Sequence, residues 1–242
     1  MKLIINADDI GLSKSVTDGI IAGIKEGCIT STSIMANMPY AEYAVKKAIE
    51  LGIDCIGLHV NLTVGKPVIK NDNLMDENGV FYYNRKQIEN EKITYKDAYE
   101  EIMAQFEKIN EYSNGKLKLD HINTHHLGLF DNHNIKQAVL DISKKLNLPI
   151  RNQDVGNDVK CPDVLYLDFT IENVNIENLK EMIKKYKEKD LVVELVTHPG
   201  FIDEYTKKVT SYLNRESELN ILKESKRIGL FEGIDLINFH QF

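Results

Sequence analysis

The sequence lacks the features that would place it among disulfide-rich or thiolate-zinc proteins. Its three cysteines, Cys28, Cys55 and Cys161, are widely spaced and form no CxxC pair. A sparse, odd set of this kind is typical of reduced thiols in a cytosolic protein rather than of a disulfide framework. The same spacing argues against a zinc site built from thiolates.

An excess of basic charge and long apolar runs are also missing. The formal net charge is -7, with acids and bases interspersed, whereas a nucleic-acid-binding protein presents a basic face to the phosphates. No apolar run is long enough to span a bilayer, and the chain starts with an expected strand instead of a signal-peptide pattern. We therefore expect a cytoplasmic protein whose partner is neither nucleic acid nor a membrane.

What the sequence does contain is an alternation of short apolar strands and helical stretches. Over 242 residues with a hydrophobic fraction of 43%, it predicts a single α/β domain, residues 1–242, with a parallel sheet or barrel and a large core. The expected strands cover 2–7, 29–35, 55–62, 117–122, 149–151, 164–169, 191–196 and 234–239. The expected helices run from an N-cap at 13–18 to Gly27, and over 40–51, 94–111, 135–146, 176–187 and 216–228.

Residues 64–118 interrupt this rhythm. The stretch is polar at first, ends in a charged helix, and is too long for an ordinary strand-to-helix connection. We expect its first part to be an excursion over the rim of the site, as a lid or a substrate-binding loop.

Chemically active residues gather where the expected strands end. The first strand ends in Asp8 and Asp9, and the strand before the last one ends in His198, Pro199 and Gly200. Because the carboxyl ends of parallel strands meet at one edge, sites are built there in α/β folds. Of the seven histidines, five stand at or just after such ends: His59, His121, His125, His126 and His198.

Each of these residues also has a structural explanation. The aspartate pair could cap the helix that follows Ser13, a lone His59 could be a hydrogen-bonded core residue, and the histidine-rich turn at 121–126 could simply be exposed. His133 and His240 are assigned to surface or packing roles. Taken together, however, a carboxylate and several imidazoles at adjacent strand ends favour a metal site.

The side chains restrict the chemistry of such a site. One carboxylate and two imidazoles with open positions suit Zn²⁺, Mn²⁺, Co²⁺ or Fe²⁺, and Mg²⁺ if water completes the shell. Because neighbouring strand residues point to opposite faces, Asp8 and Asp9 need not have the same role. One of them would bind the ion and the other would act as a general base. His198 is placed to protonate a leaving group, and the Pro199-Gly200 turn lets a substrate approach the backbone. These parts suit metal-assisted hydrolysis of an amide or ester.

A set of motifs is spread along the chain. They are residues 6–13 (Asn-Ala-Asp-Asp-Ile-Gly-Leu-Ser), Gly27 with 29–33, 57–63 (Gly-Leu-His-Val-Asn-Leu-Thr), 121–126 (His-Ile-Asn-Thr-His-His), 149–151, Glu194 with 198–200, and 215–219. In these motifs the chain resembles the YdjC family of carbohydrate deacetylases, which includes the diacetylchitobiose deacetylases. The similarity extends through most of the chain, and the Asp-Asp-x-Gly and His-Pro-Gly elements are specific in combination.

The resemblance implies a distorted (β/α) barrel related to the polysaccharide deacetylases, with its site at the carboxyl ends of the strands. It implies one divalent cation, foremost Mg²⁺ or Zn²⁺ and otherwise Mn²⁺ or Co²⁺, held by Asp9, His59 and His125. By the same resemblance Asp8 is the base and His198 the acid, and a homodimer is expected. Further candidates for binding the substrate or supporting the ligands are Arg151, His126, His121, Asn61, Pro199 and Gly200. Arg215 would serve either helix packing or the rim of the site.

The expected activity is the release of acetate from N-acetylated sugars such as diacetylchitobiose, and Tyr82 and Tyr83 of the excursion could stack on a sugar ring. The family often has Phe where this chain has Ile10, and another histidine where it has residues 127–129, so the sugar pocket can differ in shape. Two other hypotheses stay open. One is hydrolysis of another amide or a phosphoester, and the other is a sugar-binding barrel without catalysis.

Overall fold

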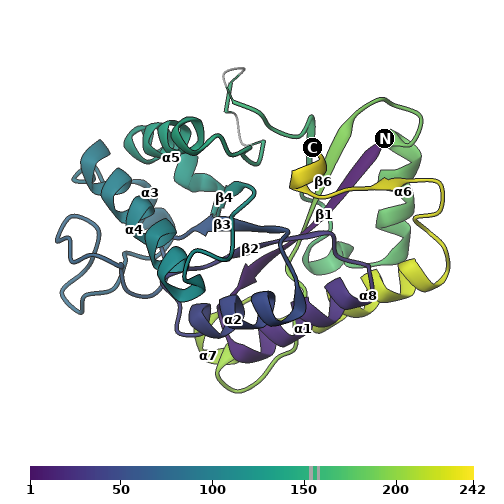
Figure 1. Cartoon of the computed structure of the whole chain (residues 1–242), viewed down its shortest axis with the longest axis horizontal. Helices are drawn as coiled ribbons and strands as arrows, with labels where there is room; N and C mark the ends of the chain where they lie inside the picture. The colour runs from purple at the N-terminus through teal and green to yellow at the C-terminus, as the bar shows by residue number, and fades with distance from the viewer. Residues whose placement is uncertain (153–154, 157–158) are drawn as a thin grey trace.

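A parallel sheet that curls into a half-barrel organises the chain. The structure is a computed structural model that describes residues 1–152, 155–156 and 159–242. The strand order is β4-β3-β2-β1-β6-β5, and the short β7 pairs with the start of β1. All pairings are parallel, so the carboxyl ends of the strands meet at one edge (Figure 1). The strands are β1 (Lys2–Ile10), β2 (Ser31–Ile34), β3 (Ile56–Val60), β4 (Ile122–Thr124), β5 (Val164–Tyr166), β6 (Val192–Thr197) and β7 (Asp235–Leu236).

Helices cover the outer face of the sheet. Helix α4 packs against α5 and α2, and α1 packs against α2 and α8, so these five form an arc (Figure 1). Within the described ranges, no helix has both the length and the apolar composition that crossing a membrane requires. The helices are α1 (Lys14–Lys25), α2 (Ala41–Leu51), α3 (Arg85–Ile88), α4 (Tyr95–Ser113), α5 (His133–Leu146), α6 (Ile176–Tyr186), α7 (Thr206–Val209) and α8 (Arg215–Arg227), with 3-10 turns η1 (Leu127–Asp131), η2 (Ile171–Asn173) and η3 (Phe239–Gln241).

Local sequence signals fix where the helices begin and end. The Ser13 hydroxyl accepts a hydrogen bond from Val16 N and caps α1 by itself. Thr94 and Asp97 form a reciprocal capping box at the start of α4, and Gly52 ends α2 in the left-handed conformation. The N-cap of α1 therefore needs neither Asp8 nor Asp9.

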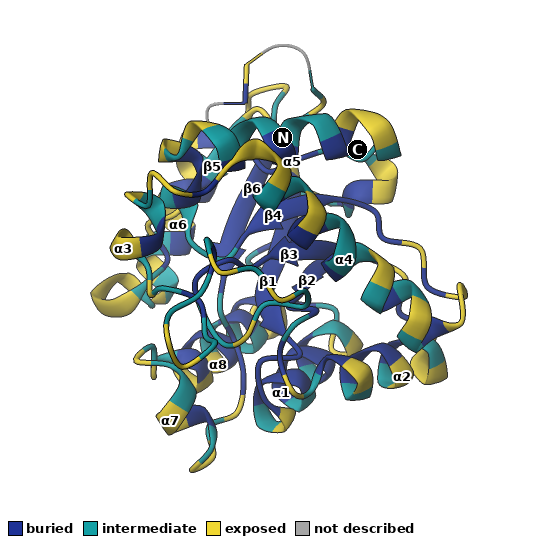
Figure 2. Ribbon diagram, turned by 90° about the vertical axis from the view of Figure 1, so that its left-hand side faces the viewer, coloured by how far each residue is buried: buried dark blue, intermediate teal, exposed yellow. Residues whose placement is uncertain are grey.

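The two faces of β1 meet different surroundings. Leu3, Ile5 and Ala7 belong to the large core under the helices, whereas Ile4 faces the concave side and packs with Phe239 and its neighbours from the C-terminal segment. Figure 2 shows the strands buried at the centre and the exposed residues on the outer faces of the helices. Because side chains alternate along a strand, the concave face next receives Asn6 and then Asp8, toward the carboxyl edge.

The expected α/β architecture is confirmed, but several boundaries differ from the predictions. Strand β1 continues through both aspartates to Ile10. The strand expected over 117–122 pairs in register with β3 only from Ile122. Leu117 and Leu119, which precede it, are buried in the core without being part of a strand. At 149–151 only one bridge forms, between Ile150 and Ile122, and the last strand shortens to Asp235–Leu236 before η3 begins.

Candidate active site

A bulge at the end of β1 brings two successive carboxylates next to the same imidazole. The pairing of β1 with β2 shifts register between Ala7 and Ile10, and Asp9 has φ of 76°. Such a backbone is uncommon outside glycine and costs conformational energy. The expectation that Asp8 and Asp9 point to opposite faces is therefore wrong. Both flank one imidazole, with Asp8 Oδ1 3.9 Å from His59 Nδ1 and Asp9 Oδ1 3.2 Å from His59 Nε2.

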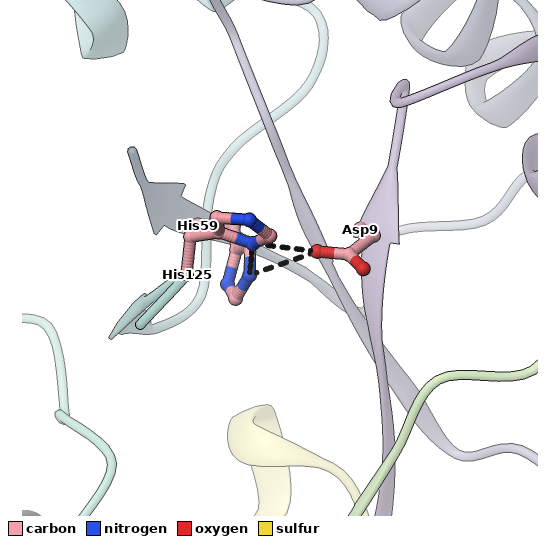
Figure 3. A group of neighbouring side chains, drawn as sticks. All are labelled: Asp9, His59 and His125. Atoms are coloured by element: carbon pink, nitrogen blue, oxygen red, sulfur yellow. Dashed lines mark hydrogen bonds and ion pairs between the residues drawn. The ribbon is translucent and has the colours of Figure 1, made fainter. Parts of the chain in front are cut away.

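Asp9, His59 and His125 bring three potential ligand atoms together (Figure 3). His125 Nδ1 lies 3.0 Å from Asp9 Oδ1 and 3.3 Å from His59 Nε2. Ligands at about 2.0–2.1 Å from an ion are roughly 3.3 Å apart in a tetrahedron and roughly 2.9 Å apart at octahedral right angles. The three residues therefore fit a divalent cation, and their spacing accommodates both Zn²⁺ and Mg²⁺.

Neighbouring polar side chains orient two members of this cluster, His59 and Asp9. His59 Nδ1 lies 2.6 Å from Asn123 Oδ1 and 3.1 Å from Ser33 Oγ, which leaves Nε2 facing Asp9. Arg215 donates to Asp9 Oδ2 over 2.6 Å, which leaves Oδ1 facing the histidines. Burial lowers the pKa of His59, but Asp8 and Asp9 outweigh it and raise that pKa overall. The choice left open for Arg215 is thereby settled: it begins α8 but reaches into the site.

Asp8 is held as a buried anion. Arg151 donates to both of its oxygens, over 2.7 and 2.9 Å, and also pairs with Glu194 over 2.7 Å. Burial alone would raise the pKa of Asp8, but Arg151 and then His59 bring it well below its usual range. The single bridge at Ile150 places Arg151 here, because Arg151 N donates to the carbonyl of Ile122 over 3.0 Å.

His198 stands across the cavity, just after β6. Its Nε2 lies 3.9 Å from Asp8 Oδ2, and its buried Nδ1 has no hydrogen-bond partner among the described residues. Its backbone N–H donates to Glu218, and its ring packs against Tyr212 with centroids 5.3 Å apart. Burial lowers the pKa of His198 to about 4, so the ring is neutral at pH 7.

Four of these residues, Asp9, His125, His198 and Arg215, line a cavity of about 450 Å³, within the range of small-molecule sites. Asp8, His59 and Arg151 are not among its lining residues. The segment around α7 and the excursion after β3 also contribute to the lining. The remaining lining residues are Leu12, Val64, Tyr83, His126, Lys207, Lys208, Val209, Thr210, Ser211 and Tyr212.

The profile of the family described as YdjC-like protein matches residues 2–228. The chain belongs to the YdjC-like family. A relative from Oceanobacillus iheyensis named carbohydrate deacetylase is 37% identical over 228 residues, covering 92% of this chain and 96% of its own. A crystal structure from Enterococcus faecalis V583, of a proposed cellobiose-phosphate cleavage protein, is 30% identical with a TM-score of 0.90 and covers 99% and 98% of the two chains. The Xyl-CE4 domain of a multidomain xylanase from a termite hindgut metagenome shares the fold, with a TM-score of 0.53 at 8% identity over 99% of this chain and 88% of that one.

In this YdjC-like chain, not every predicted site residue reaches the cavity. His126 lines it, with Nδ1 2.8 Å from Thr63 Oγ1, and burial together with His125 lowers its pKa to about 4. Asn61 instead accepts from the backbone of Thr63 and Val64 and shapes the turn after β3.

His121, Pro199 and Gly200 also lie outside the lining of the cavity. His121 stacks on Phe239 at 3.8 Å and pairs with Asp120, one level deeper in the half-barrel. Gly200 packs so tightly on α1 that a Cβ there would lie 3.1 Å from the Cα of Val16. Pro199 is buried beside it.

Sequence reasoning missed Glu218 and Tyr212. Glu218 is fully buried and accepts hydrogen bonds from His198 N and the Tyr212 hydroxyl. A signal was present, because Arg215, Glu218, Leu219 and Leu222 recur at helical spacing and form the buried face of α8. That spacing places Glu218 next to the site once Arg215 is known to reach it.

Proposed function

We propose that this YdjC-like chain is a metal-dependent hydrolase that removes acetyl groups from N-acetylated sugars. The relative named carbohydrate deacetylase supports the reaction class. The observation that carries the proposal is the meeting of three potential ligand atoms with a buried anion, Asp8, and a histidine, His198, next to a cavity that Asp9, His125 and His198 line. This is the arrangement that amide hydrolysis by a divalent cation, a base and an acid requires.

Asp9, His59 and His125 would hold the cation, with Mg²⁺ or Zn²⁺ foremost and Mn²⁺ or Co²⁺ as alternatives. When bound, such an ion polarises a carbonyl group and lowers the pKa of water. Arg215 and Asn123 keep the ligand atoms oriented toward one point.

Asp8 and His198 would move the protons of the reaction. Asp8 is ionised and takes the proton of the attacking water, while Arg151 keeps its carboxylate in place. The C–N bond of the acetamide breaks, the carbonyl carbon gains the oxygen of water, and the amine leaves with a proton from His198. His198 is neutral at pH 7, so the proton that Asp8 takes from water would pass to His198, whose Nε2 lies 3.9 Å from Asp8 Oδ2, and from there to the leaving amine.

The sugar we propose is an N-acetylglucosamine oligosaccharide such as diacetylchitobiose. A phosphoester substrate is less well supported, because two-metal phosphoester chemistry needs a second set of ligands. Only one group of three potential ligands occurs among the residues that the structure describes. A homodimer and a cytoplasmic location stay predictions, and light scattering of the purified chain tests the first.

An acetate-release screen tests the proposed function. The metal-stripped chain is supplied with Mg²⁺, Zn²⁺, Mn²⁺ or Co²⁺ and offered N-acetylglucosamine, diacetylchitobiose and longer chito-oligomers. We expect acetate release with at least one metal and none with chelator. Absence of acetate from all these sugars in metal-replete assays would overturn the proposal and favour a sugar-binding barrel.

A further inference from the structure

An exposed tyrosine stands at the rim of the cavity. The Tyr83 side chain is 63% exposed, although it is one of the residues that line the cavity. A single exposed aromatic residue is ordinary on a protein surface. An exposed tyrosine at the mouth of a polar cavity, however, is suited to ligand binding. Its ring can pack on an apolar face of a ligand while its hydroxyl group contacts the ligand's hydroxyl groups.

The Tyr83 ring is held in place by His126. The two rings make an edge-to-face contact with centroids 5.8 Å apart and planes at 86°. His126 is fixed by Thr63 Oγ1 and lies 4.4 Å, centroid to centroid, from the ring of His125. Only the His126 ring therefore separates Tyr83 from a predicted metal ligand.

The backbone that carries Tyr83 is anchored rather than free. Gln87 is buried and donates to the carbonyl of Leu74 over 2.8 Å. Ile88 seats on Gly128, where a Cβ would lie only 2.8 Å from Ile88 Cδ1. Asn132 donates to the carbonyl of Ile88 over 3.1 Å. The excursion thus forms a fixed wall of the cavity in this structure.

We propose that Tyr83 is the platform for a second sugar unit, next to the unit that loses its acetyl group. This inference rests on the proposed function and assigns a residue to substrate length. The apolar face of a pyranose ring packs on the exposed part of the Tyr83 ring, while Tyr83 keeps its contact with His126. Neighbouring Tyr82 does not qualify, because Lys86 covers its ring at 4.6 Å and it does not line the cavity.

Steady-state kinetics on diacetylchitobiose tests the platform. Losing one aromatic contact weakens binding by roughly tenfold, so Tyr83→Ala should raise KM about tenfold and change kcat less than twofold. Tyr83→Phe should behave as the native chain does, and Tyr82→Ala is the matched control that should change neither constant. Bound metal should be equal in all four proteins. An unchanged KM in Tyr83→Ala would overturn the inference.

Calorimetry separates this inference from the proposed function. In the Asp8→Asn background with metal, diacetylchitobiose should bind about tenfold more weakly when Tyr83 is replaced by alanine, and N-acetylglucosamine should bind equally with and without the replacement. If the Tyr83 replacement weakens binding of diacetylchitobiose but the native chain releases no acetate, the platform is supported and the deacetylase function is overturned. Equal weakening for the one-unit and two-unit sugars, or no binding of the two-unit sugar to the Asp8→Asn protein, would overturn the platform.

Discussion

Arg215 and Asp9 form a buried ion pair over 2.6 Å between residues 206 positions apart in the chain. Both side chains are 1% exposed, so neither charge can be satisfied by water if the other is removed. Removing one partner of such a pair destabilises a protein by about 3–5 kcal/mol. The pair therefore ties the start of α8 to the end of β1 and to the cluster of Asp9, His59 and His125.

We expect Arg215→Ala to lower the free energy of unfolding by about 3 kcal/mol in metal-free protein. The loss should be smaller with metal, because a bound cation also neutralises Asp9. Urea unfolding with chelator and with saturating Zn²⁺ measures both values. Arg227→Ala is the control, since Arg227 pairs with Glu224 on the surface of the same helix, and it should cost less than about 1 kcal/mol. Equal unfolding of Arg215→Ala and the native chain without metal would contradict the account.

Glu218 should make the stability of the chain fall as pH rises. Burial raises the pKa of Glu218 from its ordinary 4.5 to about 7. Below pH 4.5 the carboxyl is protonated in both folded and unfolded chains, so it adds no penalty. Between pH 4.5 and 7 the Glu218 carboxyl ionises in the unfolded chain but stays protonated in the folded one. The free energy of unfolding therefore falls through this range, and the total loss is about 3 kcal/mol above pH 7.

Glu218→Gln should remove that loss, because the amide can keep the contacts to His198 N and Tyr212. The variant should unfold at higher denaturant than the native chain at pH 8 and equally at pH 4, as measured by chemical denaturation. Glu224→Gln serves as control, because Arg227 lowers the pKa of the partly exposed Glu224 and an amide there should bring no gain in stability at pH 8. A Glu218→Gln variant that is less stable than the native chain at pH 8 would rule out this explanation.

Asn123 should matter for metal affinity without touching the metal. Its Oδ1 lies 2.6 Å from His59 Nδ1 and fixes the direction of Nε2. Loss of such a support weakens metal binding roughly 10–100-fold, so Asn123→Ala should show this change in competition with a chelator. Asn134→Ala is the control, because Asn134 donates to the carbonyl of Ile93, away from the cluster. Native affinity in Asn123→Ala would show that His59 needs no such support.

The positions of strand ends were enough to predict that a carboxylate and several histidines would meet at one edge of the sheet, and the family resemblance selected three of them as candidate ligands. Asp9, His59 and His125 each follow a short apolar stretch, and parallel strands bring such ends together. The direction of Asp9 could not be predicted, because the bulge that gives it φ of 76° depends on how β1 pairs with β2. Alternation along a flat strand assigns the two aspartates to opposite faces, which is wrong here.

The sequence also did not indicate how deep in the half-barrel each histidine lies. His121 and Asn123 share a face of the sheet with His59, yet His121 lies a level deeper and stacks on Phe239. Strand periodicity gives the face of a residue and not its height relative to other strands. Glu218 was missed, and the role of Arg215 stayed open, for a related reason, since only packing of α8 brings them to the carboxyl edge.

The central claim is the division of labour between two sets of side chains, and a panel of five variants tests it most directly. Bound metal per chain and acetate release are measured for each protein in the same preparation. Asp9→Ala, His59→Ala and His125→Ala should lose bound metal, whereas Asp8→Asn and His198→Ala should keep it and lose acetate release. Native metal content in the first three variants would contradict the account.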